Sequence, residues 1–407
     1  MNTSMYARLS TLMFLQFFVW GAWFVTLGTY LSGLGFSGTD IGSIYLTNNL
    51  GAIIAPFAVG LIADRYFDSE KVVAVMHLVG AGILYYASTL NSVGEMFFWL
   101  LLYNSAYMST LALANSISFG QLQNPDTQFP TIRVWGTVGW IIAGLTISFV
   151  LGASIEGVEA TSAPILMAAL GSLLLGVYAF TLPHTPPPAR DANISLGEIV
   201  GVRALTLFKD RSFAIFAVAS LLICIPLAFY YSFANLYLNE LGMTDVAAKM
   251  TLGQISEVVF MVAMPFFFRR LGVKWMLLIG MLAWVVRYAA FAYGSLDLVG
   301  LLYLGILLHG ICYDFFFVTG QIYIDQRAGA AMRASAQGFI TLLTYGAGMA
   351  IGTYAAGLVV DSYVVDGGHD WQTIWLLPCI FAAAVTVLFS VFFNEAKKDT
   401  EMSGVNA

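Results

Sequence analysis

Long apolar runs recur along the whole chain, and short polar segments separate them. A helix of about 20 apolar residues is long enough to cross a bilayer. The pattern predicts twelve spans near 9–32, 41–63, 72–91, 94–119, 131–153, 162–182, 211–238, 247–268, 272–294, 297–325, 331–360 and 371–394. The predicted fold class is therefore an all-α polytopic membrane protein. In the run 331–360, hydropathy does not separate one long span from a span plus an interfacial helix.

One connection is much longer and more polar than the others, and it follows the sixth run. It covers 183–210 and holds four prolines, Pro183, Pro186, Pro187 and Pro188. Proline-rich polar segments between periodic runs are typical of linkers. We therefore expect a six-helix bundle over 1–182, a linker over 183–210, a second six-helix bundle over 211–394 and a tail over 395–407.

The positions of lysine and arginine orient the predicted spans. If the N-terminus is cytoplasmic, fourteen of the 17 Lys and Arg residues fall in cytoplasmic segments, and the opposite loops are acidic. Cytoplasmic loops of membrane proteins carry this excess of positive charge. We therefore expect both termini, including the linker and the tail, on the cytoplasmic side.

Composition supports the membrane class and excludes others. The chain is 59% hydrophobic and 10% charged, whereas soluble domains have about 25% charged residues. Nucleic acid is not expected as a partner, because the chain has no basic patch. The composition predicts a lipid bilayer as the surroundings, and we expect a monomer. The three cysteines fall in predicted spans, which argues against a disulfide framework. No metal-ligand, phosphate-loop or nucleophile motif is present, so we expect no enzyme, cofactor or metal site.

Two carboxylates lie inside apolar runs. Glu257 lies in Thr251–Phe268, and Asp314 lies in Leu301–Ile324. A charge at membrane depth costs a few kcal/mol or more, so such residues usually line a path and have a function. A carboxylate that takes up and releases a proton is what a proton-driven carrier needs. The alternative is that a neighbouring arginine neutralises the charge to lock helices together, and Arg287 is placed to do this for Glu257.

Polar side chains share faces of the predicted spans. Arg133, Thr137 and Trp140 are spaced i, i+4 and i+7 on one helix face, and Gln254 and Glu257 share another. A cation, a hydroxyl and a flat aromatic suit a ligand with hydroxyls and a planar base, and an amide and a carboxylate can bind its polar edges. Alternatively, Arg133 extends to the membrane interface, and Thr137 and Trp140 are packing or interface residues.

The loop after the second run carries a further motif. Gly60–Arg65 (GLIADR) resembles the G-x-x-x-D-R loop of the major facilitator superfamily, although the second basic cluster is reduced to Lys71. In that superfamily the aspartate interacts with helix termini and steadies one gating state, so the resemblance makes Asp64 and Arg65 candidate gating residues. The alternative is an ordinary basic cytoplasmic loop.

Four segments together show a closer resemblance. They are FLQFFVWGAW (14–23), FPTIRVWGTVG (129–139), QISE (254–257), and YDFF (313–316) with RASAQG (333–338). They resemble the nucleoside:proton symporter family of the major facilitator superfamily. The resemblance implies two six-helix halves and import of nucleosides across the bacterial inner membrane, driven by the proton gradient. It also implies that Arg133, Thr137, Gln254, Glu257 and Asp314 lie in or near a central cavity.

The chain departs from the family pattern at two places. Ala228 and Tyr231 stand where amides are expected, and His309 stands where a tyrosine is expected. His309 lies one helical turn before Tyr313, so both are expected near Asp314 on one face. We expect Tyr231 and Tyr313 to contact the substrate. The exact solute stays open, and the runner-up is a carrier of the same fold for another small polar solute such as a sugar. An intramembrane enzyme or a channel fits less well, because a catalytic cluster is missing.

Overall fold

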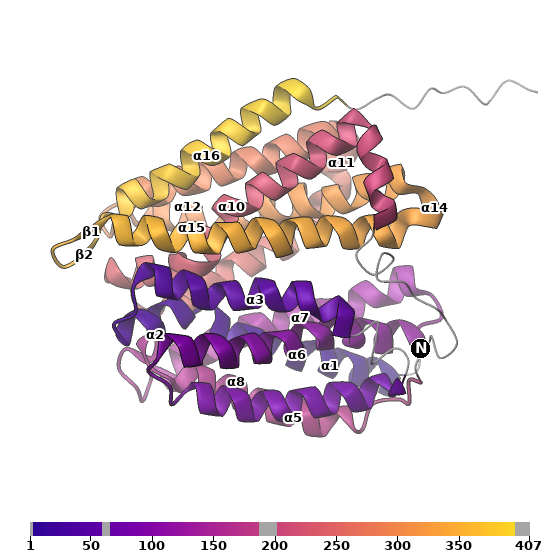
Figure 1. The fold of residues 1–407 in the computed structure, drawn as a ribbon, viewed down its shortest axis with the longest axis horizontal. Coiled ribbons are helices and arrows are strands. Elements are labelled where there is room, and N and C mark those ends of the chain that lie inside the picture. Colours follow the sequence, from indigo (N-terminus) through magenta and orange to yellow (C-terminus); the bar gives the residue numbers. More distant parts are fainter. Residues whose placement is uncertain (1–2, 59–65, 187–201, 395–407) are drawn as a thin grey trace, which may run out of the picture.

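Helices account for nearly all of the described chain. The computed structural model describes residues 3–58, 66–186 and 202–394. Figure 1 shows the helices running roughly along the long axis of the molecule in two layers, one above the other. We call α1 to α8 the N-terminal group and α10 to α16 the C-terminal group.

The N-terminal group is built from long apolar helices joined by short turns. Its elements are α1 (Thr3–Phe24), α2 (Leu27–Gly33), α3 (Gly38–Ala58), α5 (Ser69–Ala87), α6 (Val93–Gly120), α7 (Pro125–Leu145), the π-helical turn η2 (Thr146–Leu151), the 3-10 turn η3 (Val158–Ala160) and α8 (Ala163–Ala179). α1 packs against α7 and α8, and α3 packs against α6. The pairing of α1 with α7 brings the segment 14–23 against the helix that carries Arg133, Thr137 and Trp140.

The C-terminal group follows the same plan. Its elements are the 3-10 turn η4 (Val202–Lys209), α10 (Arg211–Glu240), α11 (Val246–Tyr293), α12 (Val299–Leu307), α13 (His309–Cys312), the π-helical turn η5 (Tyr313–Val318), α14 (Thr319–Thr341), the π-helical turn η6 (Leu342–Gly348), α15 (Met349–Ser362), β1 (Val364–Val365), β2 (Gly368–His369) and α16 (Trp371–Phe392). α12, α13, η5 and α14 follow one another almost without interruption. Asp314 lies in the π-helical turn of this series.

Two glycines interrupt the longest helices. Gly272 in α11 has φ 67° and Gly329 in α14 has φ 65°, values outside the helical region. Glycine has no Cβ and adopts positive φ readily, whereas other residues rarely do. α11 and α14 are therefore each two helices that meet at a glycine. Gly272 lies where the predicted run 272–294 begins, and Gly329 lies between the runs 297–325 and 331–360.

The outer surface is apolar. Nine helices of the described part of the chain are long and apolar enough to cross a membrane, and α8 is a shorter apolar helix. Large apolar side chains are exposed on the helices, including Val262 at 79% and Ile380 at 64%. A soluble protein rarely exposes contiguous apolar surface on this scale, and the helices therefore fit a lipid environment.

The two ends of the molecule differ. β1 and β2 form a short antiparallel hairpin in which Val364 pairs with His369, and Figure 1 shows it at the end opposite the N-terminus. We call these the hairpin end and the N-terminal end. At the hairpin end the groups are in direct contact, because Thr29 Oγ1 donates to Asn235 Oδ1 at 2.5 Å. Gly42 of α3 also lies directly against the Thr353 carbonyl of α15.

Candidate functional site

A pocket lies between the two helix groups and is lined by both. The pocket is narrow in this structure, with a cavity volume of about 20 Å³. The N-terminal group contributes Gly21, Phe24, Val25, Trp140 and Gly144, and the C-terminal group contributes Tyr230, Tyr231, Ala247, Met250, Thr251 and Gln254. Ligand sites are typically concave and largely apolar with a few placed polar groups. The aromatic rings and the single amide of this pocket fit that description.

Close contact between α1 and α7 places Trp140 in the pocket. A Cβ on Gly139 would collide with the Phe14 carbonyl, so only glycine lets the two backbones approach this closely. Trp140 then packs edge-on against Trp20, with ring centroids 5.5 Å apart. The Phe24 ring, which also contacts Trp20, lies with its centroid 6.5 Å from that of Trp140. The indole is thereby held on the wall of the pocket rather than at a membrane interface.

Arg133 and Thr137 lie on the same helix, nearer the N-terminal end. The Arg133 guanidinium lies over the Phe17 ring, 4.0 Å from its centroid, in the range of a cation–π contact. Arg133 also interacts electrostatically with Glu257 of the C-terminal group. Arg133 and Thr137 are both half-buried. The cation therefore faces the other group, although neither residue lines the pocket itself.

Aromatic contacts continue from the pocket into the C-terminal group. The ring centroids of Tyr231 and Phe24 lie 6.2 Å apart across the boundary between the groups. The Tyr231 ring also lies 6.2 Å from the His309 ring, which in turn lies 6.0 Å from Tyr313. The Tyr345 hydroxyl donates to the Tyr313 hydroxyl at 3.3 Å. These rings form a continuous wall from α1 to η5.

His309 stands between a buried cation and a carboxylate. Arg287 is fully buried, and its Nη1 donates to His309 Nδ1 at 3.2 Å. Because a guanidinium has no acceptor, Nδ1 must accept, and the ring proton of neutral His309 lies on Nε2. Nε2 is 3.9 Å from Glu257 Oε2. Arg287 was expected to neutralise Glu257, and the structure instead places the imidazole between the two.

Glycine contacts fix this part of α13 against α11. A Cβ on Gly310 would lie too close to the backbone of Ser256 and Glu257. Ser256 Oγ donates to the Leu307 carbonyl at 2.5 Å and joins the same helices. His309 is thus held beside Glu257 by backbone packing.

Asp314, like Arg287, is a fully buried charged group of this region. Among the described residues neither carboxylate oxygen of Asp314 has a hydrogen-bond partner. An ionised carboxylate without a partner at membrane depth is costly, and a bound proton removes that cost. π-helical turns such as η5 often occur at functional sites.

The structure brings most of the sequence-predicted residues to one region. Trp140, Tyr231 and Gln254 line the pocket. Arg287, Glu257 and Tyr313 are connected to the pocket wall through His309. Arg133, Thr137 and Asp314 do not line the pocket. Asp64 and Arg65 lie outside the described residues.

Two aromatic residues of the pocket were not predicted from the sequence. Phe24 and Tyr230 both line the pocket, and the Tyr230 ring also covers the Arg287 guanidinium at 3.3 Å. Adjacent residues of a helix point in different directions, so the prediction that Tyr231 contacts the substrate made Tyr230 a poor candidate for the same role. The feature of the sequence that could have identified Tyr230 is the pair Tyr230-Tyr231 within an apolar helix.

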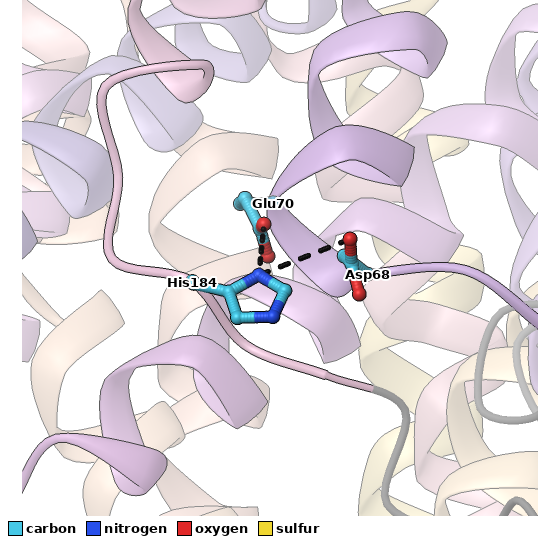
Figure 2. Close-up of side chains that lie close together, drawn as sticks. All are labelled: Asp68, Glu70 and His184. Carbon is cyan, nitrogen blue, oxygen red and sulfur yellow. Dashed lines mark hydrogen bonds and ion pairs between the residues drawn. The ribbon is translucent and has the colours of Figure 1, made fainter.

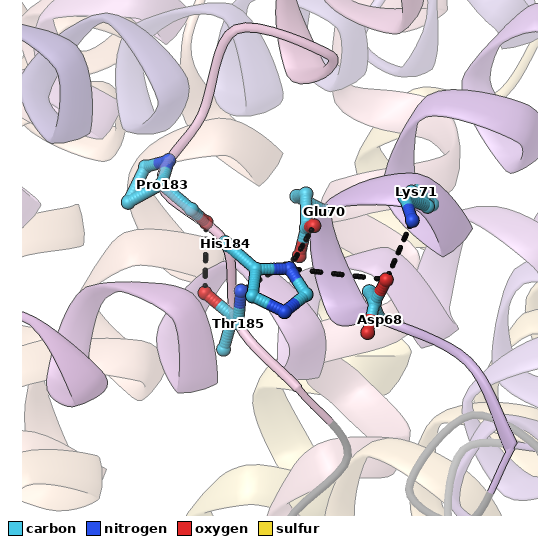
Figure 3. A network of polar contacts seen from close by, with 6 residues as sticks. All are labelled: Asp68, Glu70, Lys71, Pro183, His184 and Thr185. Atoms are coloured by element: carbon cyan, nitrogen blue, oxygen red, sulfur yellow. Dashed lines mark hydrogen bonds and ion pairs between the residues drawn. The ribbon is translucent and has the colours of Figure 1, made fainter.

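A separate cluster could in principle hold a metal ion. Asp68, Glu70 and His184 offer ligand atoms within 4.8 Å of one another at the start of α5. Figure 2 shows the His184 ring facing both carboxylates, with Nδ1 3.1 Å from Glu70 Oε1. Figure 3 shows Lys71 paired with Asp68 at 2.7 Å and the Thr185 amide donating to Glu70 at 2.9 Å. These contacts tie the segment after α8 to α5 and account for the cluster without a metal.

Comparisons with known proteins point in one direction. The profile of a family described as nucleoside H+ symporter matches residues 1–398. The chain is 42% identical to the putative nucleoside transporter YegT of Escherichia coli K12, over 98% of this chain and 96% of that protein. It is 37% identical to the xanthosine permease of the same strain, over 95% of each. The crystal structure of the nucleoside transporter NupG matches with a TM-score of 0.87 and 34% identity, over 97% of this chain and 100% of that one.

Proposed function

Because the chain belongs to the nucleoside H+ symporter family, we propose that it carries nucleosides into the cell together with protons. The observation that carries this proposal is the pocket between the groups. It combines flat aromatic side chains from both groups with one amide. The Glu257 carboxylate faces His309, whose ring packs against the pocket residue Tyr231.

The pocket chemistry suits a nucleoside. Trp140 and Tyr231 offer faces on which a planar base can stack, and stacking contributes about 0.5–1.5 kcal/mol beyond burial. Gln254 has both donors and an acceptor for a base edge or a ribose hydroxyl. Glu257 and Arg133 supply further polar contacts at the N-terminal side of the pocket, with Thr137 and Tyr313 nearby. The substrate would thus be sandwiched between the groups.

The carboxylates provide the coupling to protons. We assign the transported proton to Asp314, with Glu257 as the group that links it to the substrate. Asp314 is buried without a hydrogen-bond partner among the described residues, and an unpaired charge there is costly. Binding a proton removes that cost. His309, which presents Nε2 towards Glu257, connects the carboxylate to the fixed charge of Arg287.

The architecture supports a carrier of two repeated halves. We propose twelve membrane-spanning helices, with Gly272 and Gly329 as breaks between consecutive spans. The halves cover 1–182 and 211–394, joined by 183–210 and followed by a tail over 395–407. The chain acts as a monomer in the bacterial inner membrane, and the N-terminal end with both termini faces the cytoplasm.

The halves rock about the pocket to expose it to each side in turn. The contacts at the hairpin end support a state in which the outer side is closed. We assign the closing of the cytoplasmic side to the loop that holds Asp64 and Arg65, by the resemblance of its sequence.

Competition for uptake tests the substrate class. Cells that express the protein take up a labelled nucleoside in the presence of excess unlabelled nucleosides, free bases, ribose or hexoses, with and without an uncoupler. Nucleosides should compete strongly, sugars weakly, and the uncoupler should abolish accumulation. If sugars compete as strongly as nucleosides, the carrier transports another polar solute and the assignment fails.

A further inference from the structure

Two carboxylates bridge the helix groups at the hairpin end, and neither of them lines the pocket. Glu159 belongs to η3 of the N-terminal group and is buried. Asp361 lies in the last turn of α15 in the C-terminal group. Each accepts hydrogen bonds from the first turn of a helix in the opposite group.

Asp361 completes the N-terminus of α3. The first N–H groups of a helix have no partner within the helix. In α3, Ser37 Oγ accepts from the Asp40 amide and Asp40 accepts from Ser37. The Gly38 and Thr39 amides remain, and they donate to Asp361 at 2.5 and 2.8 Å. The Thr39 hydroxyl also donates to this carboxylate.

Glu159 accepts a hydrogen bond from the first turn of α11 in the same way. The residue before this helix, Asp245, makes no side-chain cap. The Ala247 amide donates to Glu159 Oε1 at 2.8 Å, and the Ala248 amide donates to Ser148 Oγ at 3.0 Å. Both acceptors come from the N-terminal group. The first turn of α11 is therefore capped across the boundary.

Two amides reinforce the Glu159 contact. Asn235 Nδ2 donates to Glu159 Oε2 at 2.8 Å, and Asn239 Nδ2 donates at 3.0 Å. Asn235 also accepts from Thr29. The carboxylate thus lies in a polar network that joins α10 and α11 to the N-terminal group.

The two arrangements are reciprocal. α3 is the second long helix of the N-terminal group, and α11 is the second long helix of the C-terminal group. Both helices begin at the hairpin end. Asp361 follows the predicted span 331–360, the fifth of the C-terminal group. Glu159 follows the predicted span 131–153, the fifth of the N-terminal group. A helix N-terminus carries partial positive charge that favours a carboxylate. Separation of the groups at this end would leave both helix N-termini and both carboxylates without these partners.

We propose that Glu159 and Asp361 are paired latches that hold the hairpin end closed and release it when the pocket opens to that side. This inference rests on the proposed function, because it assumes that the pocket opens to each end in turn. The two carboxylates act on the equilibrium between closed and open forms, not on the substrate. They are positioning residues of the transport cycle.

Distances across the hairpin end test the latches directly. Spin labels are attached at Ala153→Cys in the N-terminal group and Val364→Cys in the C-terminal group, both exposed positions. The native cysteines Cys224, Cys312 and Cys379 are buried, and a sample without introduced cysteines controls for their labelling. Pulsed electron resonance then measures the distance distribution of the purified full chain in lipid nanodiscs without nucleoside.

Glu159→Gln and Asp361→Asn should each move population from the short to the long distance. The closed-to-open ratio should fall about tenfold per variant, because charge-assisted hydrogen bonds are lost. Glu156→Gln and Asp366→Asn make the same exchanges at exposed positions of this end and should leave the distribution unchanged. Asn235→Ala, which keeps both carboxylates, is the second variant and should give a smaller shift.

A purely structural role would show a different result. If the variants melt at a lower temperature but keep the wild-type distances, the latches are wrong. If the carboxylate variants fail to fold, the Asn235→Ala distances decide, and an unchanged distribution overturns the proposal. Nucleoside uptake is scored separately. If the wild type transports no nucleoside but the variants still shift the distances, the proposed function is rejected and the role of the two carboxylates stands.

Discussion

At the scale of single residues, the pocket depends on very few polar groups. Gln254 is the one amide among its lining residues, which are otherwise mainly aromatic or apolar. A substrate with several hydrogen-bonding groups therefore relies on Gln254 and on the charged residues beside the pocket. Each of these side chains should have a measurable effect on binding.

Gln254→Ala should weaken nucleoside binding roughly three- to tenfold, because a lost neutral hydrogen bond costs about 0.5–1.5 kcal/mol. Calorimetry on the purified protein measures the affinity, and Gln372→Ala, an exposed glutamine of α16, is the matched control. Equal affinity of Gln254→Ala and wild type would show that the amide does not contact the substrate.

His309 supplies a second prediction at this scale. His309→Phe removes the hydrogen-bond acceptor of Arg287 Nη1. The Nε and Nη2 atoms of Arg287 already lack hydrogen-bond acceptors among the described residues. An unsatisfied buried donor costs about 1–3 kcal/mol, so the melting temperature should fall. His309→Gln keeps an acceptor oxygen and should melt closer to wild type. If the two variants melt alike, the contact between Arg287 and His309 does not stabilise the protein.

The site residues show what the sequence can and cannot predict. Trp140, Tyr231 and Gln254 were predicted from spacing and resemblance, and all three line the pocket. Phe24 was missed because an apolar ring in an apolar helix carries no signal of its own. The place of His309 between Arg287 and Glu257 was missed because it depends on how α11 meets α13. Contacts between helices are not encoded in the periodicity of either one.

At the scale of helices, glycine contacts set the positions of the site residues. Gly139 brings α7 onto α1, and Gly310 brings α13 onto α11. The first contact positions Trp140 and Arg133, and the second positions His309 beside Glu257. Small residues commonly allow such close helix contacts in membranes.

Gly139→Val should push α1 and α7 apart, reduce nucleoside affinity and lower stability, because overpacking typically costs about 1–3 kcal/mol. Gly82→Val is the matched control, since a Cβ on Gly82 meets no atom within 4 Å. Thermal melting and calorimetry of both variants provide the comparison. A Gly139→Val protein that binds and melts like Gly82→Val would contradict the role of this contact.

Element boundaries were predictable where a residue type carries the information. Gly272 marks a break because positive φ favours glycine, and it coincides with the predicted start of a run. The capping role of Glu159 was not predictable, because the sequence shows only an acidic residue in a loop. Its partners in α10 and α11 are at least 76 residues away in the chain.

At the scale of the whole molecule, the pocket lies between two helix groups that are joined at the hairpin end. This arrangement lets one site serve both sides of the membrane, provided that the contacts at each end form and break in turn. Hydropathy and charge were sufficient to predict a polytopic helical protein. The state of the hairpin end could not be predicted, since it depends on contacts between distant segments such as Asp361 with Gly38 and Thr39.

The central claim is that nucleoside and proton move together, and proton movement driven by nucleoside tests it most directly. Purified protein is placed in proteoliposomes that enclose a pH-sensitive dye, and nucleoside is added outside at equal pH on both sides. We predict acidification of the interior with nucleosides, little or none with ribose, and none with Asp314→Asn, whose amide cannot exchange a proton. Nucleoside uptake without acidification, or full acidification by Asp314→Asn, would contradict the account.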